Sequence, residues 1–277
     1  MTGRNLTANR ITSVANEGVK AVRKLRDRKY RDSTGTAYVE GIRQVIEAIQ
    51  QDVEIEKILV SDDFLASVSN TEIVQAVMRC PAPKVMVSDE VFRSFSIKEG
   101  PSGLAAVIRQ HLLDMNDLFT VFSGVWVCLW EIADPGNLGT ILRTMDATGV
   151  KGLILAGNCT DPYDPTAIRA SMGGVFSKIL VKSNLNKLVE MINTHSIAAY
   201  GTSDAADNYY REVRYPQDML LIMGSERQGI PDQLSELCTT MVNLPMKGVC
   251  DSLNLAVATG VLLYEILDQH TMNSGKE

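Results

Sequence analysis

Three segments of the sequence place polar, glycine-containing loops directly after short apolar runs. They span residues 134–149, 221–231 and 242–260, and the third loop leads into an apolar helical pattern. Because glycine lets a backbone approach a ligand closely, main-chain amides from the two later loops can converge on one small molecule. The spacing therefore predicts a cofactor pocket in the last third of the chain.

The first of these segments carries a cation that is suited to chemistry on an anion. At about 100° per residue, Arg143 points away from the apolar helical stripe that begins at Leu138, so it is free to project toward a loop or an anionic ligand. A surface ion pair is the alternative interpretation of Arg143. Asn137 lies at the predicted helix start, where it can serve as an N-cap or bond to a neighbouring loop.

The polar residues of the two later segments also allow a structural and a functional interpretation. Glu226 lies between Gly224 and Gly229, either as a solvated acid in a turn or as part of a pocket. Ser252 and Asn254 lie next to the start of the last helix, where each can cap the helix or contact a ligand. The apolar stripe of that helix is predicted to face the core and comprises Leu253, Ala256, Val257, Gly260, Val261, Tyr264 and Leu267.

The composition is ordinary for a folded protein and the length is sufficient for two domains. The chain has 277 residues, of which 45% are apolar and 22% are charged. Apolar runs are shorter than the roughly 18 residues that cross a bilayer, and the first residues do not form a secretory signal. We therefore expect no membrane segment and a cytoplasmic location.

Several classes of site are disfavoured by the motifs. The five cysteines form no CxxC pair and the three histidines are isolated from them, so we expect buried or half-buried thiols, no disulfide framework and no metal site. A GxGxxG segment after a strand and a GxxxxGK[ST] segment are both absent from the sequence. A nucleotide-dependent oxidoreductase and a P-loop enzyme are therefore disfavoured.

Charge is divided unevenly along the chain. The net charge of −6 arises from +2 over residues 1–110 and −8 over residues 111–277. Within residues 20–31, seven cations accompany one acid, which is typical either of a solvated helix face or of a surface that contacts phosphates. The candidate RNA-binding residues of this run are Lys20, Arg23, Lys24, Arg28 and Lys29.

Strands and helices alternate in two regions. Residues 1–110 read as a small α/β unit, with a long first helix at 14–31 and a basic surface, and the polar stretch 111–119 is predicted to be a linker. Residues 120–277 alternate more regularly, which predicts a mostly parallel sheet with ligands at the carboxyl ends of its strands. The predicted strands of this second region are 125–131, 152–155, 178–181, 196–200, 219–223 and 241–244.

Taken together and in order, the three segments resemble the three motifs of the SpoU/TrmH family of RNA ribose methyltransferases, in the SPOUT superfamily. Asn137 and Arg143 match the first motif, Glu226 the second, and Ser252 and Asn254 the third. The likeness extends over about residues 120 to 268. The segments 19–49 and 97–107 more weakly resemble the RNA-binding domain that precedes the catalytic domain in many members, which is similar in fold to certain ribosomal proteins.

The resemblance implies an enzyme that moves the methyl group of S-adenosylmethionine to a ribose 2′-hydroxyl of structured RNA. It also implies a deep trefoil knot in the C-terminal α/β domain, which general topology rules would have rejected, and a homodimer paired through the knotted domains. Arg143 is the implied catalytic residue, and Asn137, Glu226, Ser252 and Asn254 are expected to hold the loops and Arg143 in position. The implied cofactor-binding residues are Thr202, Gly224, Gly229, Leu244, Met246 and Leu253.

The RNA substrate is less closely defined than the reaction. A compact basic domain in front of the catalytic domain favours ribosomal RNA, whereas relatives that modify tRNA commonly carry helical extensions. A tRNA enzyme and an rRNA enzyme that confers antibiotic resistance stay as alternatives, and a non-catalytic RNA-binding protein would predict a degenerate cofactor loop. Two departures from the family pattern, at Asp146 and at residues 250–251, bear on the substrate more than on the class of enzyme.

Overall fold

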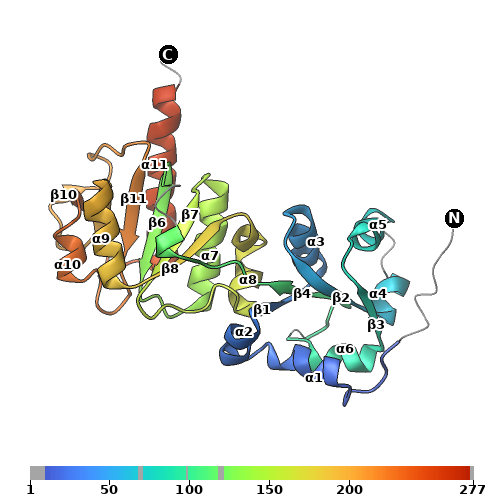
Figure 1. Cartoon of the computed structure of the whole chain (residues 1–277). Coiled ribbons are helices and arrows are strands. Elements are labelled where there is room, and N and C mark those ends of the chain that lie inside the picture. Colours follow the sequence, from blue (N-terminus) through green and yellow to red (C-terminus); the bar gives the residue numbers. More distant parts are fainter. Residues whose placement is uncertain (1–9, 68–70, 98, 118–121, 275–277) are drawn as a thin grey trace. The chain divides into compact units, whose positions relative to one another are not determined.

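A computed structural model describes residues 10–67, 71–97, 99–117 and 122–274. By their contacts the residues form two compact units (Figure 1). The first unit contains residues 1–110 together with 161–176, and the second contains residues 111–160 and 177–277. Each unit has its own sheet, and the sequence did not predict that the segment 161–176 belongs with the first.

The first unit is a four-stranded sheet covered by helices on both faces. The strand order is β1-β4-β2-β3; β4 is antiparallel to both its neighbours, and β2 and β3 are parallel. In Figure 1, α1 and α6 lie on one face of this sheet and α3 and α5 on the other. The bounds are α1 (Glu17–Lys24), β1 (Thr36–Glu40), α3 (Ile42–Gln50), β2 (Ile55–Ser61), α4 (Asp62–Ser67), α5 (Thr71–Arg79), β3 (Lys84–Val87), α6 (Asp89–Phe95) and β4 (Leu104–Arg109).

The first helix is shorter than predicted, because the chain forms two helices where the basic run predicted one. After α1 ends, Asp27 starts α2 (Arg28–Thr34), and its carboxylate accepts a hydrogen bond of 2.8 Å from the amide of Lys29. Gly35 ends α2 in the left-handed conformation with φ 64°. The only acid inside the basic run is therefore a helix cap, which the apolar periodicity did not reveal.

A buried ion pair attaches the segment 161–176 to the rest of the first unit. The side chain of Arg31 is 1% exposed, and its Nε and Nη2 each lie 2.7 Å from Oδ2 of Asp161. Its Nη1 donates to the main-chain carbonyls of Leu25 and Arg26, both at 2.9 Å. This guanidinium is fully engaged inside the unit, so one of the seven cations has a structural role. The segment itself carries α8 (Pro165–Ser171) and the short helix η2 (Gly174–Phe176).

The second unit is built on an eight-stranded sheet whose described pairings are all parallel. Its strand order is β10-β12-β9-β11-β6-β7-β8-β5, which confirms the predicted mostly parallel sheet; the trefoil knot stays a prediction. The strands are β5 (Leu113–Asp114), β6 (Val125–Trp130), β7 (Gly152–Ala156), β8 (Ile179–Ser183), β9 (Ala199–Thr202), β10 (Asn208–Tyr209), β11 (Met219–Met223) and β12 (Thr240–Asn243). The helices are η1 (Met115–Asp117), α7 (Pro135–Ala147), α9 (Leu185–His195), α10 (Asp232–Ser235) and α11 (Leu255–Ser274).

Both faces of this second sheet are buried. Trp126 and Cys128 of β6 face one core cluster, to which α9 and α10 contribute apolar side chains. The alternate residues Val127 and Leu129 are 0% exposed on the opposite face. Continuous apolar runs in the strands follow from this burial on two sides.

The segment predicted to be a linker, residues 111–119, supplies part of the second unit. Its β5 pairs in parallel with β8 at the edge of the sheet, and Leu113 packs against the core. Residues 118 and 119 of the predicted linker lie outside the described residues. The polar composition of the segment concealed a strand of only two residues.

Most of the predicted core stripe of the last helix is wrong, although Ala256 is buried as predicted. Val257 and Tyr264 are 52% and 55% exposed, and Leu253, just before the helix, is 39% exposed. The buried face of α11 instead contains Leu255, Ala256, Thr259, Leu262, Leu263 and Ile266. Because α11 is apolar on two faces, a spacing of three and four residues fits either face, and spacing could not select the buried one. None of the described helices is long and apolar enough to span a bilayer.

Replacement of the buried guanidinium provides a test of the first unit. Arg31→Met should lower the free energy of unfolding by about 3 to 5 kcal/mol, because Asp161 would stay buried without a counter-charge. Urea denaturation of the full chain measures this change. Lys29→Met, an exposed neighbour on the same helix, should change the stability by less than about 0.5 kcal/mol. Equal stability of the two variants would contradict the structural role of Arg31.

Candidate active site

The order of strands brings two of the three polar loops together. β6 and β11 are neighbours at the centre of the sheet, with β7 and β8 on one side and β9 and β12 on the other. The carboxyl ends of parallel strands share one edge of the sheet, and ligands bind where the strand order reverses. The loop after β6 leads into α7 and the loop after β11 spans residues 224–231, so both lie at this edge.

One side-chain amide joins all three predicted motifs. Nδ2 of Asn137 donates a hydrogen bond of 2.8 Å to Oε1 of Glu226. Oδ1 of the same amide accepts a hydrogen bond of 3.0 Å from Nδ2 of Asn254. The start of α7, the loop after β11 and the start of α11 are therefore held at one point. This arrangement supports the functional interpretation of all three residues.

Two helices of the site, α7 and α11, begin at capping residues, and the cap of α7 is not the one predicted. Asp134, and not Asn137, is the N-cap of α7, and its carboxylate accepts the amide of Asn137 at 2.6 Å. The side chain of Asn137 is thereby free to bridge the loops. Asn254 has both roles, since its oxygen accepts the amides of Ala256 and Val257 at 2.9 and 3.3 Å while its nitrogen donates to Asn137.

The glycines of the second loop are required by the loop itself. A Cβ atom on Gly224 would lie 2.1 Å from the carbonyl carbon of Gly229, so no side chain fits there. Gly229 has φ 66°, a conformation that other residues rarely adopt, and its amide donates to the carbonyl of Ser225 at 2.9 Å. Gly224 is thus required by a close approach within the loop, and the expected approach of this loop to a ligand stays a prediction.

Arg143 and Ser252 stand outside the three-residue junction. Arg143 is exposed on α7 and makes no hydrogen bond or ion pair with any residue that the structure describes. Ser252 is also exposed, and its hydroxyl donates to the adjacent Asp251 at 3.3 Å. Within the described residues, Arg143 therefore lacks the surface ion pair that was its alternative interpretation. Ser252 likewise does not cap α11, because Asn254 does.

The remaining cofactor candidates lie around the same edge of the sheet. Thr202 is the last residue of β9, and Leu244 directly follows β12, so each stands at the carboxyl end of a strand. Both are half-buried, as is Met246 farther along the third loop, while Leu253 is partly exposed. Thr202 and Leu244 therefore lie at the carboxyl ends of two adjacent strands, since β9 pairs with β12.

Burial perturbs three of the thiols in the second unit. Burial raises the pKa of Cys128 and of Cys159, and raises that of Cys238 to about 11, so these thiols stay protonated at neutral pH. Cys250 is exposed in the third loop, which corrects the expectation of buried or half-buried thiols for that residue. Within the described ranges, no group of His, Cys, Asp and Glu is arranged to hold a metal ion.

The departure at Asp146 has a structural explanation. Its carboxylate accepts a hydrogen bond of 2.6 Å from the hydroxyl of Ser177 and lies 3.2 Å from Nζ of Lys178. Partial burial acts to raise the pKa of Asp146, but these two partners outweigh it and the pKa is lowered. The acid therefore ties α7 to the residues that precede β8.

The basic run of the first unit contains cations of two kinds. Arg23 is half-buried, and its guanidinium donates to the carbonyl and hydroxyl of a serine in α6 at 3.2 and 3.0 Å. Lys20 and Arg28 face carboxylates about one helical turn away, at 2.8 and 3.8 Å. Lys24 and Lys29 are exposed and form no ion pair within the described part of the chain. These last two are the best placed to meet a phosphate.

Comparison with known proteins places the chain in a family. A model described as the SpoU rRNA Methylase family matches residues 124–264, which include all three motifs. The chain belongs to the SpoU rRNA methylase family. A second model, the MRM3-like substrate binding domain, matches residues 16–106. The family that the three motifs predicted is thereby confirmed.

Relatives of this SpoU chain resemble it over nearly its whole length. The 23S rRNA (guanosine(2553)-2′-O)-methyltransferase RlmP of Bacillus subtilis is 28% identical over 92% of this chain and 98% of its own. The solved structure of an AdoMet-bound rRNA methyltransferase from Sinorhizobium meliloti has a TM-score of 0.84 at 29% identity, covering 95% of this chain and 98% of that one. The AdoMet complex of the SpoU methyltransferase AviRb from Streptomyces viridochromogenes has a TM-score of 0.81 at 26% identity, covering 92% and 98%.

The junction at Asn137 makes a measurable prediction about loop order. Asn137→Ala removes both bridging hydrogen bonds, so the loops 224–231 and 244–254 should exchange amide hydrogens faster, while the strands keep their protection. Hydrogen exchange followed by mass spectrometry measures this difference. Thr140→Ala, an exposed change on the same helix, should leave both loops unaltered. Unchanged loop exchange in Asn137→Ala would contradict the bridging role.

Proposed function

We propose that this SpoU protein transfers the methyl group of S-adenosylmethionine to a ribose 2′-hydroxyl in ribosomal RNA. The observation that carries the proposal is the Asn137 junction, which holds three motif loops at the ligand-binding edge of a parallel sheet. Family membership and relatives that are named as 23S rRNA 2′-O-methyltransferases support the same reaction. Since those relatives act on ribosomal RNA, we prefer it to tRNA. The proposal includes a cytoplasmic location for the protein.

The residues at the carboxyl edge fit S-adenosylmethionine. Leu244 and Met246 are half-buried and apolar, as an adenine ring and a thioether-like tail require, and Thr202 and the 224–231 loop add polar main-chain groups. When bound, this cofactor supplies a sulfonium methyl group, which is a good electrophile. The protein must then orient the ribose hydroxyl and stabilise the negative charge that develops on its oxygen.

Arg143 has the properties needed to stabilise that charge. Its guanidinium is exposed and is not engaged by any described residue, so it is available to an RNA phosphate or to the developing alkoxide. A guanidinium stays protonated at neutral pH, which suits electrostatic stabilisation better than general-base catalysis. Asn137, Glu226 and Asn254 act as positioning residues, and Ser252 precedes Asn254 by two residues in the third loop.

The exposed apolar face of α11 supports a homodimer. Val257 and Tyr264 lie two helical turns apart on this face and are more than half exposed. α7 packs beside α11, with the methyl group of Thr144 3.8 Å from the position that a Cβ of Gly260 would occupy. We infer that a second copy covers this face by two-fold symmetry. Arg143 lies on α7, next to this face. In such a dimer, Arg143 of one subunit would contribute to an active site that the other subunit completes.

The first unit is proposed to bind the RNA substrate. The match to a substrate-binding domain and the exposed cations Lys24 and Lys29 support this role. Contacts to phosphates supply affinity that depends on salt, whereas recognition of one RNA site requires contacts to bases or to RNA shape. The basic run therefore accounts for attachment to RNA but not for the choice of nucleotide.

The role of Arg143 can be separated from cofactor binding. Arg143→Ala should lower the rate of methyl transfer to transcribed 23S rRNA by at least about a hundredfold, as expected when a group that stabilises an oxyanion is lost. The affinity for S-adenosylmethionine, measured by calorimetry, should stay within about twofold. Lys182→Ala, which removes an exposed cation from β8 of the same unit, should leave both quantities unchanged. Near-normal transfer by Arg143→Ala would refute its assignment.

The homodimer makes a prediction about mass in solution. Tyr264→Glu places a carboxylate on the exposed face of α11, so burial of that face would cost free energy and the protein should become a monomer. Light scattering coupled to gel filtration measures the mass. Gln233→Glu, which adds the same charge on the exposed side of α10, should stay dimeric. A dimer that survives Tyr264→Glu would place the interface elsewhere.

A further inference from the structure

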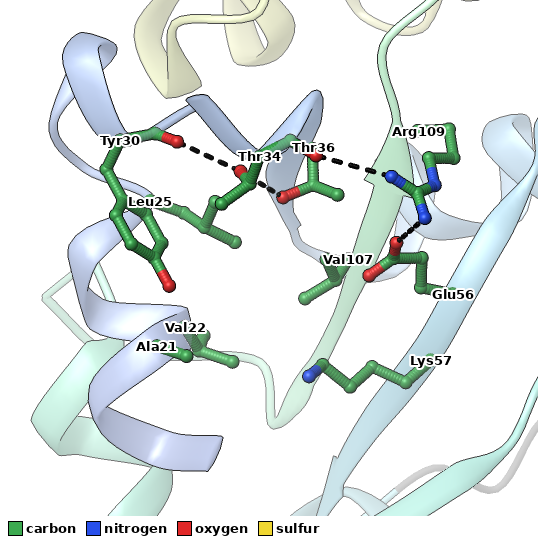
Figure 2. A pocket seen from close by; sticks show the side chains of 10 residues that line it. All are labelled: Ala21, Val22, Leu25, Tyr30, Thr34, Thr36, Glu56, Lys57, Val107 and Arg109. Carbon is green, nitrogen blue, oxygen red and sulfur yellow. Dashed lines mark hydrogen bonds and ion pairs between the residues drawn. The ribbon is translucent and has the colours of Figure 1, made fainter. Parts of the chain in front are cut away.

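The first unit contains a cavity of about 250 Å³ between the α1–α2 region and the sheet (Figure 2). Ala21, Leu25 and Val107 give it an apolar floor, and Tyr30, Lys57 and Arg109 contribute to its rim. The lining residues come from α1, α2, β1, β2 and β4 and from Leu25, which directly follows α1, so the cavity lies within one unit. It belongs to none of the three motif loops.

Several polar groups of the rim already have partners within the unit. Nη2 of Arg109 lies 2.9 Å from a carboxylate oxygen of Glu56, and its Nη1 donates to the carbonyl of Thr34 at 3.3 Å. The hydroxyls of Thr34 and Thr36 lie 2.8 Å apart and bond to one another. The charge of Glu56 is therefore offset by Arg109, as the dashed lines in Figure 2 show.

Two polar groups that reach into the cavity have no partner among the described residues. The ammonium group of Lys57 is carried by a half-buried side chain, and it forms no ion pair or hydrogen bond with a described residue. The hydroxyl of Tyr30 likewise has no hydrogen bond within the described part of the unit. Figure 2 shows both side chains entering the space between α1 and β4 from opposite sides. A half-buried cation without a counter-charge favours an anionic ligand.

The chemistry of the whole cavity matches one nucleotide. An apolar floor suits the faces of a base, the phenol of Tyr30 suits a polar base edge, and Lys57 suits a phosphate. Lys24 adds positive charge at the rim, since its Nζ lies 5.6 Å from the centre of the Tyr30 ring. A free anion would use the ammonium group but would leave the apolar floor uncovered.

We propose that this cavity receives one unstacked nucleotide of the RNA substrate. The base lies on the floor formed by Ala21, Leu25 and Val107, and the phosphate meets Lys57. The proposal rests on the proposed activity on RNA, and it adds a base contact to the salt-dependent attachment provided by the basic run. Such a contact discriminates between single-stranded and paired regions, because a paired base is not free to enter.

Binding of single-stranded RNA by the full chain tests the cavity. Lys57→Met keeps the apolar stem and removes the charge, so the dissociation constant for a fluorescent ten-nucleotide RNA at fixed salt should rise about five- to tenfold. Ala21→Leu should weaken binding to a similar degree by filling the floor, with thermal unfolding as the check on its fold. The control Arg43→Met removes an exposed cation that does not line the cavity, and it should change binding less than about twofold. Equal binding by Lys57→Met and Arg43→Met would overturn the proposal.

Crosslinking distinguishes a base contact from a phosphate contact. RNA that contains 4-thiouridine should crosslink to peptides that include Tyr30 or Lys57, and uridine monophosphate should compete with this RNA better than orthophosphate does. Crosslinks confined to other peptides, or equal competition by orthophosphate, would overturn the base contact.

The same variants separate this proposal from the proposed function. Methyl transfer by the wild-type protein, together with an unchanged KM for RNA in Lys57→Met, would overturn the cavity proposal and leave the enzyme intact. Crosslinks at Tyr30 and Lys57 without any methyl transfer by the wild-type protein would support the cavity and reject the activity.

Discussion

The second unit depends on one primary amide that both donates and accepts a hydrogen bond. Asn137 donates to Glu226 and accepts from Asn254, so it needs the two functions that only an amide side chain combines at this length. Aspartate would face Glu226 with a like charge, and leucine would offer neither function. The bridge exists because Asp134 caps α7 and because Gly224 lets the second loop close on itself.

The cations of the first unit differ in whether they hold its fold together. Arg31 is buried against Asp161 and Arg23 is bonded to α6, so two guanidinium groups of the basic run hold the unit together. Lys24 and Lys29 are exposed and form no ion pair within the described part of the unit. A dense basic run is therefore not a uniform surface, and each cation must be assigned by its burial and its partners. The uncompensated Lys57, outside that run, would have been missed by charge density alone.

Much of the fold and of the site could be predicted from the sequence, and the failures have physical causes. The main strands of the second sheet were predicted because strands buried on both faces are short apolar runs. The buried face of α11 was not, since the exposed face of this helix is apolar too and its sequence pattern resembles that of a core-facing surface. The break at Asp27 was missed because a cap depends on one local hydrogen bond. A bond from Asn137 to a neighbouring loop was one of its two predicted roles, but spacing alone could not select that role over the helix cap, because the partners are 89 and 117 residues away. The Lys57 cavity joins residues from five elements, and only the folded chain brings them together.

The segment 161–176 has a consequence for how modular this protein is. The chain passes between the two units after Gln110, after Thr160 and after Phe176, so three covalent connections join them instead of one. A gene fragment that ends at residue 110 would encode Arg31 without its acidic counterpart, and a fragment that begins there would leave the apolar side chains of α8 unmatched. A chimaera that replaces residues 1–110 alone would therefore separate Arg31 from Asp161, so the smallest exchangeable piece of the first unit includes residues 161–176.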